Sequence, residues 1–197
     1  MKDKFKGYEI GIYGNNNAED KFVVWTGNDK VAAKYYFFDK KTGDTKFLAD
    51  AFSWLKEENM ATMKPVEYKS RDGLTIHGYL TLPKGVEAKN LPVVINPHGG
   101  PWARDIWGFN NEVQFLANRG YAVLQMNFRG STGYGKEFWL KGNKQWGKTM
   151  QDDISDGVAY LIKEGIADPQ RVAIYGASYG GYATLAGITF TPDLYCC

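Results

Sequence analysis

The fold is decided by the stretch RVAIYGASYGGYATLAG at residues 171–187. Its apolar, β-branched beginning predicts a buried strand, and its small residues from Tyr179 onward predict a helix. Between them lies a G-x-S-x-G turn, a pattern typical of a sharp strand-to-helix bend. Gly176 and Gly180 suit that bend because a Cβ at either position would collide with neighbouring backbone. The stretch therefore predicts Ser178 at the tip of a strained turn.

Ser178 is the candidate catalytic nucleophile. Its hydroxyl is expected to project at the carboxyl edge of a sheet, where the N-terminus of the following helix offers unpaired N–H groups and a partial positive charge. An oxyanion would be stabilised beside it. The alternative is a glycine-rich tight turn with an inert serine, but the strand and helix that flank the motif favour the nucleophile.

A second motif supports the first. The strand VVIN runs into PHGGPW, so that residues 93–102 match the H-G-G loop that follows an early strand in many α/β-hydrolases. We expect the backbone N–H groups of Gly100 and Tyr179 to bind the oxyanion. His98 and Gly99 are expected to order this loop or line the pocket; the alternative is a glycine turn without a ligand. His98 is not the expected general base, because hydrolases of this fold take their histidine after the nucleophile.

A third glycine-rich segment, NFRGSTGYG at residues 127–135, is expected at the same edge of the sheet. Its Arg129 could bind a substrate carboxylate or pair with a buried acid, and the structural ion pair is the favoured role. Three acids near the start of the next predicted helix are expected to cap it and complement its dipole: Asp152, Asp153 and Asp156.

The order of elements predicts an α/β fold of the α/β-hydrolase type, with a partial, mostly parallel sheet flanked by helices. The expected elements are a hairpin at 66–68 and 74–82, strands at 91–96, 122–127 and 172–175, and helices at 111–119, 152–164 and from 179 onward. Before them, residues 8–48 read as four short antiparallel strands, like one β-propeller blade. The expected divisions are a partial blade at 1–50, a linker helix at 51–64 and a catalytic unit at 65–197.

Composition argues against several classes of partner. Lys and Arg total 24 against 22 acidic residues, and these charges are scattered, so no nucleic-acid partner is expected. The charged N-terminus is followed by no long apolar run, so neither a signal peptide nor membrane association is expected. The only two histidines lack a third ligand at metal-site spacing, so we expect no metal and no cofactor. Cytoplasmic and periplasmic locations both stay open, as does the oligomeric state.

Taken together, the motifs resemble the prolyl oligopeptidase family of serine peptidases, most closely its acylaminoacyl peptidase and dipeptidyl peptidase-like branch. Four segments carry the resemblance: SRDGLTIHGY at 70–79, NPHGGPW at 96–102, NFRGSTGYG at 127–135 and GASYGGYA at 176–183. Their order and spacing are far more specific than any one motif.

The resemblance implies that residues 8–48 are the final blade of an N-terminal propeller that limits access to large substrates. It also implies that Ser178 attacks a peptide carbonyl and forms an acyl-enzyme, while Tyr179 and the 98–100 loop hold the oxyanion. The family supplies its triad aspartate and histidine beyond the point reached here, so the chain is expected to be a C-terminally truncated fragment that is inactive alone. The alternatives are a small-ester carboxylesterase and a non-catalytic interaction module with the same fold.

Overall fold

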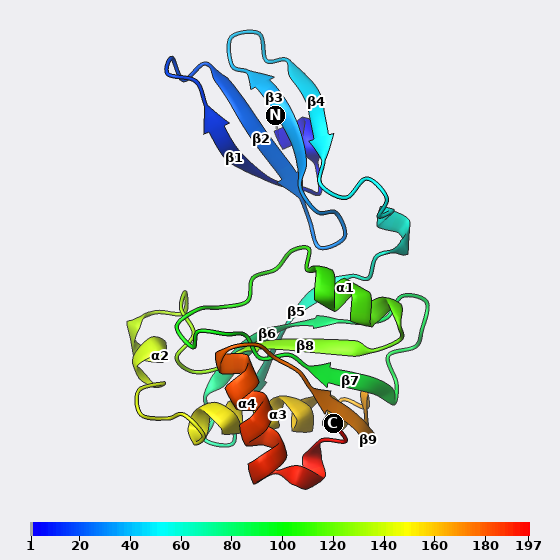
Figure 1. Ribbon diagram of the computed structural model, residues 1–197, viewed down its shortest axis with the longest axis vertical. Coiled ribbons are helices and arrows are strands. Elements are labelled where there is room, and N and C mark those ends of the chain that lie inside the picture. Colours follow the sequence, from blue (N-terminus) through cyan, green and yellow to red (C-terminus); the bar gives the residue numbers. More distant parts are fainter. Residues whose placement is uncertain (1) are drawn as a thin grey trace.

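The N-terminal part of the chain folds into a four-stranded antiparallel meander, in which each strand pairs with the next along the chain (Figure 1). The structure is a computed structural model that describes residues 2–197. A short 3-10 helix, η1 (Lys2–Phe5), precedes the sheet. The strands are β1 (Glu9–Asn15), β2 (Lys21–Gly27), β3 (Lys34–Asp39) and β4 (Thr45–Asp50).

Aromatic pairs hold the first sheet together rather than a closed core. Tyr36 packs its ring against Phe5 and Phe47, while Tyr13 packs on Tyr35 and stays 73% exposed. The four predicted strands are present, and Gly43 has the predicted positive φ, +77°, in the turn between β3 and β4. A sheet with such exposed faces gains its remaining stability from contacts beyond itself.

The predicted linker helix at 51–64 is wrong. This segment consists of turns and one 3-10 helix, η2 (Glu57–Asn59), which has no side-chain cap. Met63 already belongs to the next strand, where it pairs with Thr81, and its N–H donates to the carboxylate of Asp29 at 2.8 Å. Pro65 lies in that strand, which forms an edge of the second sheet, where a missing N–H is tolerated.

The second sheet has five strands in the order β5-β6-β8-β7-β9. They are β5 (Met63–Lys69), β6 (Thr75–Thr81), β7 (Leu91–Ile95), β8 (Ala122–Asn127) and β9 (Ala167–Ile174). Strand β7 lies parallel to β8 and β9, whereas β5-β6 and β6-β8 are antiparallel. The sheet therefore has four strands that run in one direction, β5, β7, β8 and β9, and only β6 runs against them.

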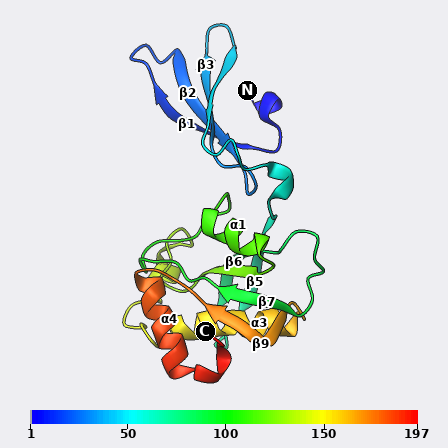
Figure 2. The ribbon, with the colours of Figure 1, turned by 45° about the vertical axis from the view of Figure 1, so that its right-hand side comes forward.

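Helices cover both faces of this sheet (Figures 1 and 2). Helix α1 (Asn111–Asn118) packs Val113 on Val94 and Val123 of one face. Helices α3 (Thr149–Lys163) and α4 (Tyr179–Phe190) cover the other face, where the side chains of Ile154 and Leu124 are fully buried. Two short elements complete the chain, α2 (Lys136–Leu140), which the sequence did not predict, and η3 (Pro192–Leu194).

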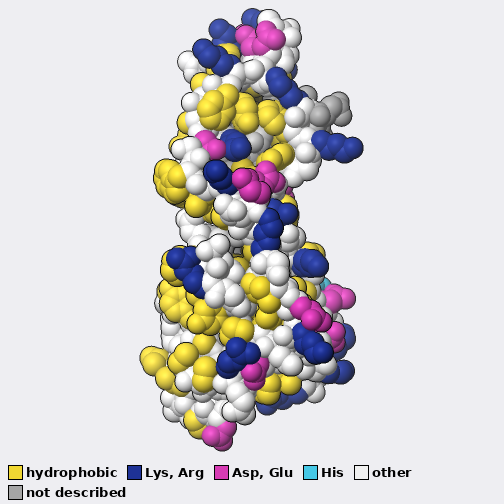
Figure 3. Space-filling view, turned by 90° about the vertical axis from the view of Figure 1, so that its right-hand side faces the viewer, with side chains coloured by type: hydrophobic (Ala, Val, Ile, Leu, Met, Phe, Trp, Pro, Cys, Tyr) yellow, Lys and Arg dark blue, Asp and Glu magenta, His cyan; other side chains and the backbone are white. Residues whose placement is uncertain are grey.

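Helix α1 also joins the two sheets. The Gln114 amide donates to the carbonyl oxygens of Asp29 and Ala61 and accepts from the Ala61 N–H, at 2.8 to 2.9 Å. These bonds connect the β2-β3 turn of the first sheet to the α/β unit. The result is an elongated molecule with hydrophobic side chains showing on both parts (Figure 3). Within residues 2–197, no helix has the length and apolar character needed to span a membrane.

Substitution of Leu124 by alanine should lower the free energy of unfolding by about 2–5 kcal/mol. The Leu124 side chain extends from β8 into the core beneath α3 and is completely buried. Leu185→Ala is the matched control, because Leu185 is 64% exposed on α4 and its loss should have little effect. Urea unfolding followed by tryptophan fluorescence measures both. Equal destabilisation by the two substitutions would contradict the assigned core.

Candidate active site

Ser178 occupies a strained bend between β9 and α4. Its backbone has φ 56° and ψ −122°, a left-handed conformation that non-glycine residues rarely adopt and that costs about 1–3 kcal/mol. The side chain is exposed. This is the bend that the G-x-S-x-G pattern predicts, with the serine at its tip and helix α4 beginning at the next residue.

The two glycines that flank the bend are required by close backbone contacts. A Cβ on Gly176 would lie 2.6 Å from the carbonyl carbon of Gly180, and a Cβ on Gly180 would lie 2.1 Å from the carbonyl oxygen of Pro97. Both distances are far below ordinary contact. The first turn of α4 therefore packs directly against the backbone of the loop that follows β7.

That packing brings the H-G-G loop to the serine. A Cβ on Gly99 would lie 3.3 Å from the Cβ of Ser178 and 3.8 Å from its Oγ. Gly100 has φ +127°, and a Cβ there would lie 2.7 Å from the Trp102 nitrogen, so only glycine suits this position. Tyr179 is the first residue of α4, where a backbone N–H has no partner within the helix. Both predicted oxyanion donors thus belong to segments that meet at Ser178.

His98 is held by hydrogen bonds that leave neither ring nitrogen for Ser178. Its Nδ1 lies 2.7 Å from the Gly99 carbonyl oxygen, which can only accept, so Nδ1 carries a proton. Burial lowers the pKa of the imidazole. Its Nε2 lies 2.8 Å from the Ser131 hydroxyl oxygen, and that hydroxyl in turn lies 2.7 Å from the Phe128 carbonyl oxygen. The ring also stacks on Phe128 with centroids 4.4 Å apart. These contacts connect the His98 ring to Gly99 of its own loop and to Phe128 and Ser131 of the segment after β8.

Ser131 is a site residue that the sequence analysis missed. It lies in the glycine-rich segment after β8 and connects that segment to the H-G-G loop through His98. A serine among loop glycines gives no sequence signal for such a contact. His77, by contrast, lies in β6 and stacks on Tyr134 with centroids 5.1 Å apart.

Arg129 forms the buried ion pair that the sequence favoured over substrate binding. Its guanidinium donates to Asp153 at 2.7 and 2.8 Å and to Asp72 at 2.7 and 3.0 Å. Its backbone N–H also donates to Asp153 at 2.9 Å. The carboxylates of Asp153 and Asp72 raise the pKa of the guanidinium, which therefore stays charged. This network fixes the start of the loop that carries Ser131.

Two of the three predicted helix-capping acids have other roles. Helix α3 begins at Thr149, three residues earlier than expected, so Asp153 and Asp156 lie beyond its first turn. Asp153 pairs with Arg129, and Asp156 accepts from both the side chain and the backbone N–H of Arg71. Only Asp152 lies in the first turn, and it too contacts Arg71, at 2.9 Å.

The part of the chain that the structure describes contains no set of side chains suited to bind a metal ion. Across residues 2–197, no three His, Cys, Asp or Glu side chains are grouped closely enough to hold an ion. Cys196 and Cys197 are exposed free thiols.

Comparison with known proteins assigns part of the chain to a family. Residues 107–197, which include Ser178 and helix α4, match the Prolyl oligopeptidase family. These residues belong to a prolyl oligopeptidase family domain. The chain is similar to dipeptidyl aminopeptidase BIII of Pseudoxanthomonas mexicana, with 48% identity over 170 residues that make up 83% of this chain and 25% of that protein. It therefore spans about a quarter of the length of this relative.

Solved structures of family members show the same architecture. A puromycin-hydrolysing peptidase of Mycobacterium tuberculosis superposes with a TM-score of 0.77 at 30% identity, covering 89% of this chain and 28% of that one. An acylaminoacyl peptidase of Pyrococcus horikoshii superposes with a TM-score of 0.76 at 29% identity, and the match covers 96% of this chain and 30% of that one. The chain shares the α/β-hydrolase fold of these peptidases, as its motifs predict.

Gly180→Ala should destabilise the protein by about 1–3 kcal/mol, because the new Cβ would push the elbow away from the Pro97 carbonyl. Gly181→Ala, one residue further along α4, is the control: its Cβ would meet the Gly176 oxygen at 3.4 Å, an ordinary contact. Thermal unfolding separates the two. If Gly180→Ala had the same melting temperature as the wild type, the bend at Ser178 and the H-G-G loop would not pack as described.

Arg129→Met should lower stability by about 3–5 kcal/mol, because methionine leaves the fully buried Asp153 carboxylate without its cation. Lys41→Met, which breaks the exposed pair with Asp20, should leave stability close to wild type. Urea unfolding at neutral pH checks both variants. Similar losses of unfolding free energy in the two variants would mean that the Arg129 network contributes no more to stability than an exposed ion pair.

Proposed function

We propose that this chain carries the nucleophile and the oxyanion site of a serine-type exo- or oligopeptidase. The observation that supports it most is the exposed Ser178 hydroxyl at a positive-φ bend, packed against Gly99 of the H-G-G loop. Strain of this kind persists where the surrounding packing holds it, and it is frequent at catalytic residues. The similar proteins are named as peptidases, which supports a peptide rather than a simple ester as substrate.

In the proposed reaction, Ser178 Oγ attacks the carbonyl carbon of the scissile peptide bond. The N–H groups of Gly100 and Tyr179 bind the oxygen that becomes negative, and one such donor contributes about 3 kcal/mol to lowering the barrier. A general base takes the proton of the Ser178 hydroxyl and passes it to the amine, which leaves as the C–N bond breaks. The acyl-enzyme ester remains on Ser178 until water hydrolyses it, which releases the acid and restores the serine hydroxyl. His98, Ser131 and the Arg129 network hold the loops that carry these groups.

The general base is proposed to come from outside residues 1–197. Both nitrogens of His98 are bound, to Gly99 and Ser131, while His77 lies on β6 beside Glu67 and Tyr134. Removing a base from a serine hydrolase removes most of its rate. We therefore infer that the 197-residue chain alone is nearly inactive.

We infer that residues 1–50 form the last blade of a β-propeller, that 51–64 connect it and that 65–197 form the first part of the catalytic unit. The exposed faces of β1 to β4 and the short share of the relatives' length support this arrangement. A propeller over the site would admit peptides and exclude folded proteins.

Fluorophosphonate labelling of the purified chain should be slow, because the chain has the nucleophile Ser178 but no general base to activate it. The Ser178→Ala substitution should abolish the residual labelling. The full product of the gene, assayed with a dipeptide anilide, should hydrolyse it in a Ser178-dependent manner. Ser131→Thr, which keeps a hydroxyl for His98, serves as the control for both assays. Rapid Ser178-dependent labelling of the 197-residue chain would contradict the need for an outside base.

A further inference from the structure

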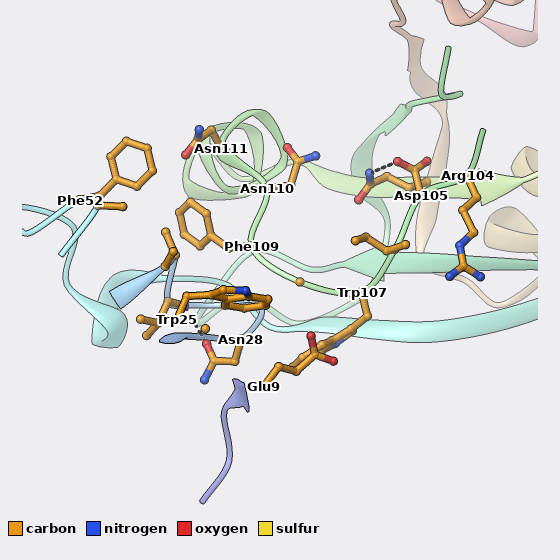
Figure 4. Close-up of a pocket in the computed structure, with 18 residues that line it drawn as sticks. Glu9, Trp25, Asn28, Phe52, Arg104, Asp105, Trp107, Phe109, Asn110 and Asn111 are labelled. Atoms are coloured by element: carbon orange, nitrogen blue, oxygen red, sulfur yellow. Dashed lines mark hydrogen bonds between the residues drawn. The ribbon is translucent and has the colours of Figure 1, made fainter. Parts of the chain in front are cut away.

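A cavity of about 440 Å³ lies between the first sheet and the α/β unit (Figure 4). One wall comes from the first sheet and the segment after it, including Trp25, Asn28 and Phe52. The opposite wall is the loop at 104–111 together with Gln125 of β8. Its volume falls in the range of small-ligand sites. No step of the reaction proposed for Ser178 uses it.

Two buried acceptor atoms in this wall have no donor among the described residues. The Asp105 carboxylate accepts from the Gln125 amide nitrogen through Oδ1, at 2.9 Å. Its other oxygen, Oδ2, and the Gln125 Oε1 are both buried and without a hydrogen-bond partner in residues 2–197. Gln125 is only 2% exposed. A buried acceptor left unbound costs about 1–3 kcal/mol, so a donor-bearing ligand would gain from binding here.

The backbone that carries Asp105 is held by hydrogen bonds to β8. The Asp105 N–H donates to the Asn127 side-chain oxygen at 2.8 Å, and the Asn127 amide donates back to the Asp105 carbonyl at 3.1 Å. The same amide nitrogen lies 2.8 Å from the Tyr134 hydroxyl. These bonds attach the loop to the end of β8 beside Gln125. The Asp105 backbone is thus fixed before a ligand arrives, and its carboxylate is oriented by the bond from the Gln125 amide, which lowers the entropy cost of binding.

The surroundings favour a cation over a neutral donor. Glu9 adds a second carboxylate to the lining. The indole N–H of Trp107 is bound to the Met63 carbonyl at 3.0 Å, which fixes the ring in the cavity wall and suits it to contact with a cation. The one cation of the lining, Arg104, lies against Gly133, and Figure 4 shows its guanidinium turned away from the Asp105 carboxylate.

We propose that Asp105 and Gln125 bind a primary ammonium group in the cavity between the two sheets. An ammonium offers three N–H donors, enough for Asp105 Oδ2 and Gln125 Oε1 together. The group can belong to a peptide N-terminus or to a lysine side chain. This inference goes beyond the proposed peptidase function, since binding here needs no chemistry at Ser178.

The ionisation of Asp105 gives the site a pH dependence. Burial raises the pKa of its carboxyl to about 6. The charged or titratable neighbours are Glu9 and Arg104 in the cavity lining and Tyr134 beside the loop. Only the ionised carboxylate attracts an ammonium group strongly. The affinity of the cavity for an ammonium group therefore rises as the pH increases through about 6, where the Asp105 carboxyl loses its proton.

NMR titration of the Ser178→Ala chain, which prevents turnover, tests the proposal at about pH 7. The probes are glycylglycinamide, which carries an α-ammonium, Nα-acetyl-lysine amide, which carries an ε-ammonium, and N-acetyl-glycylglycinamide, which carries neither. Shifts of the Trp107 indole and Gln125 amide resonances report binding. At least one ammonium probe should bind tenfold or more tightly than the acetylated peptide, and the two ammonium probes identify the source.

Asp105→Asn should weaken that binding at least tenfold while keeping the shape of the side chain. Asp44→Asn, on the exposed β3-β4 turn, should leave it unchanged. If Asp105→Asn perturbs the fold, the loss of binding by the Ser178→Ala chain below pH 6 provides the same test. Equal binding of the acetylated peptide, unchanged affinity in Asp105→Asn, or no shift with any probe would each overturn the proposal. None of these outcomes would affect the assignment of Ser178.

Discussion

The site depends on one contact, the approach of helix α4 to the loop after β7. Because Gly180 lies so close to the Pro97 carbonyl that no side chain fits between them, the two segments have one way to pack. Strands β7 and β9 are parallel neighbours, so their carboxyl ends meet at one edge and the loops that follow them are forced together. The strained backbone of Ser178 is maintained by this packing.

Around that contact, polar side chains hold the loops without taking part in the proposed chemistry. Arg129 attaches the segment after β8 to Asp153 of α3, and Ser131 of the same segment attaches His98. The hydrogen bonds of His98 and its contact with Phe128 leave the imidazole as a fixed part of the loop. A histidine and an ion pair beside a nucleophile can therefore position its loops rather than take part in the reaction. Their hydrogen-bond partners distinguish these two roles better than their distance from the nucleophile does.

Local sequence signals predicted the elements near the site well. The elbow around Ser178 and the strands β7 and β8 follow from short patterns of apolar and glycine residues whose conformation depends on near neighbours. Two of the failures involve distant partners. The segment at 51–64 contains helix-forming residues, yet its end at Met63 pairs with Thr81 and donates its N–H to Asp29, far along the chain. The roles of Asp153 likewise depend on a pairing that no local pattern encodes.

Gln114 has a mechanical consequence for the molecule. One side chain in α1 bonds to Asp29 in the first sheet and to Ala61 in the connecting segment. Any hinge rotation of the four-stranded sheet against the α/β unit would stretch these bonds together, because they share a single amide. Gln114 therefore restrains the first sheet against the α/β unit.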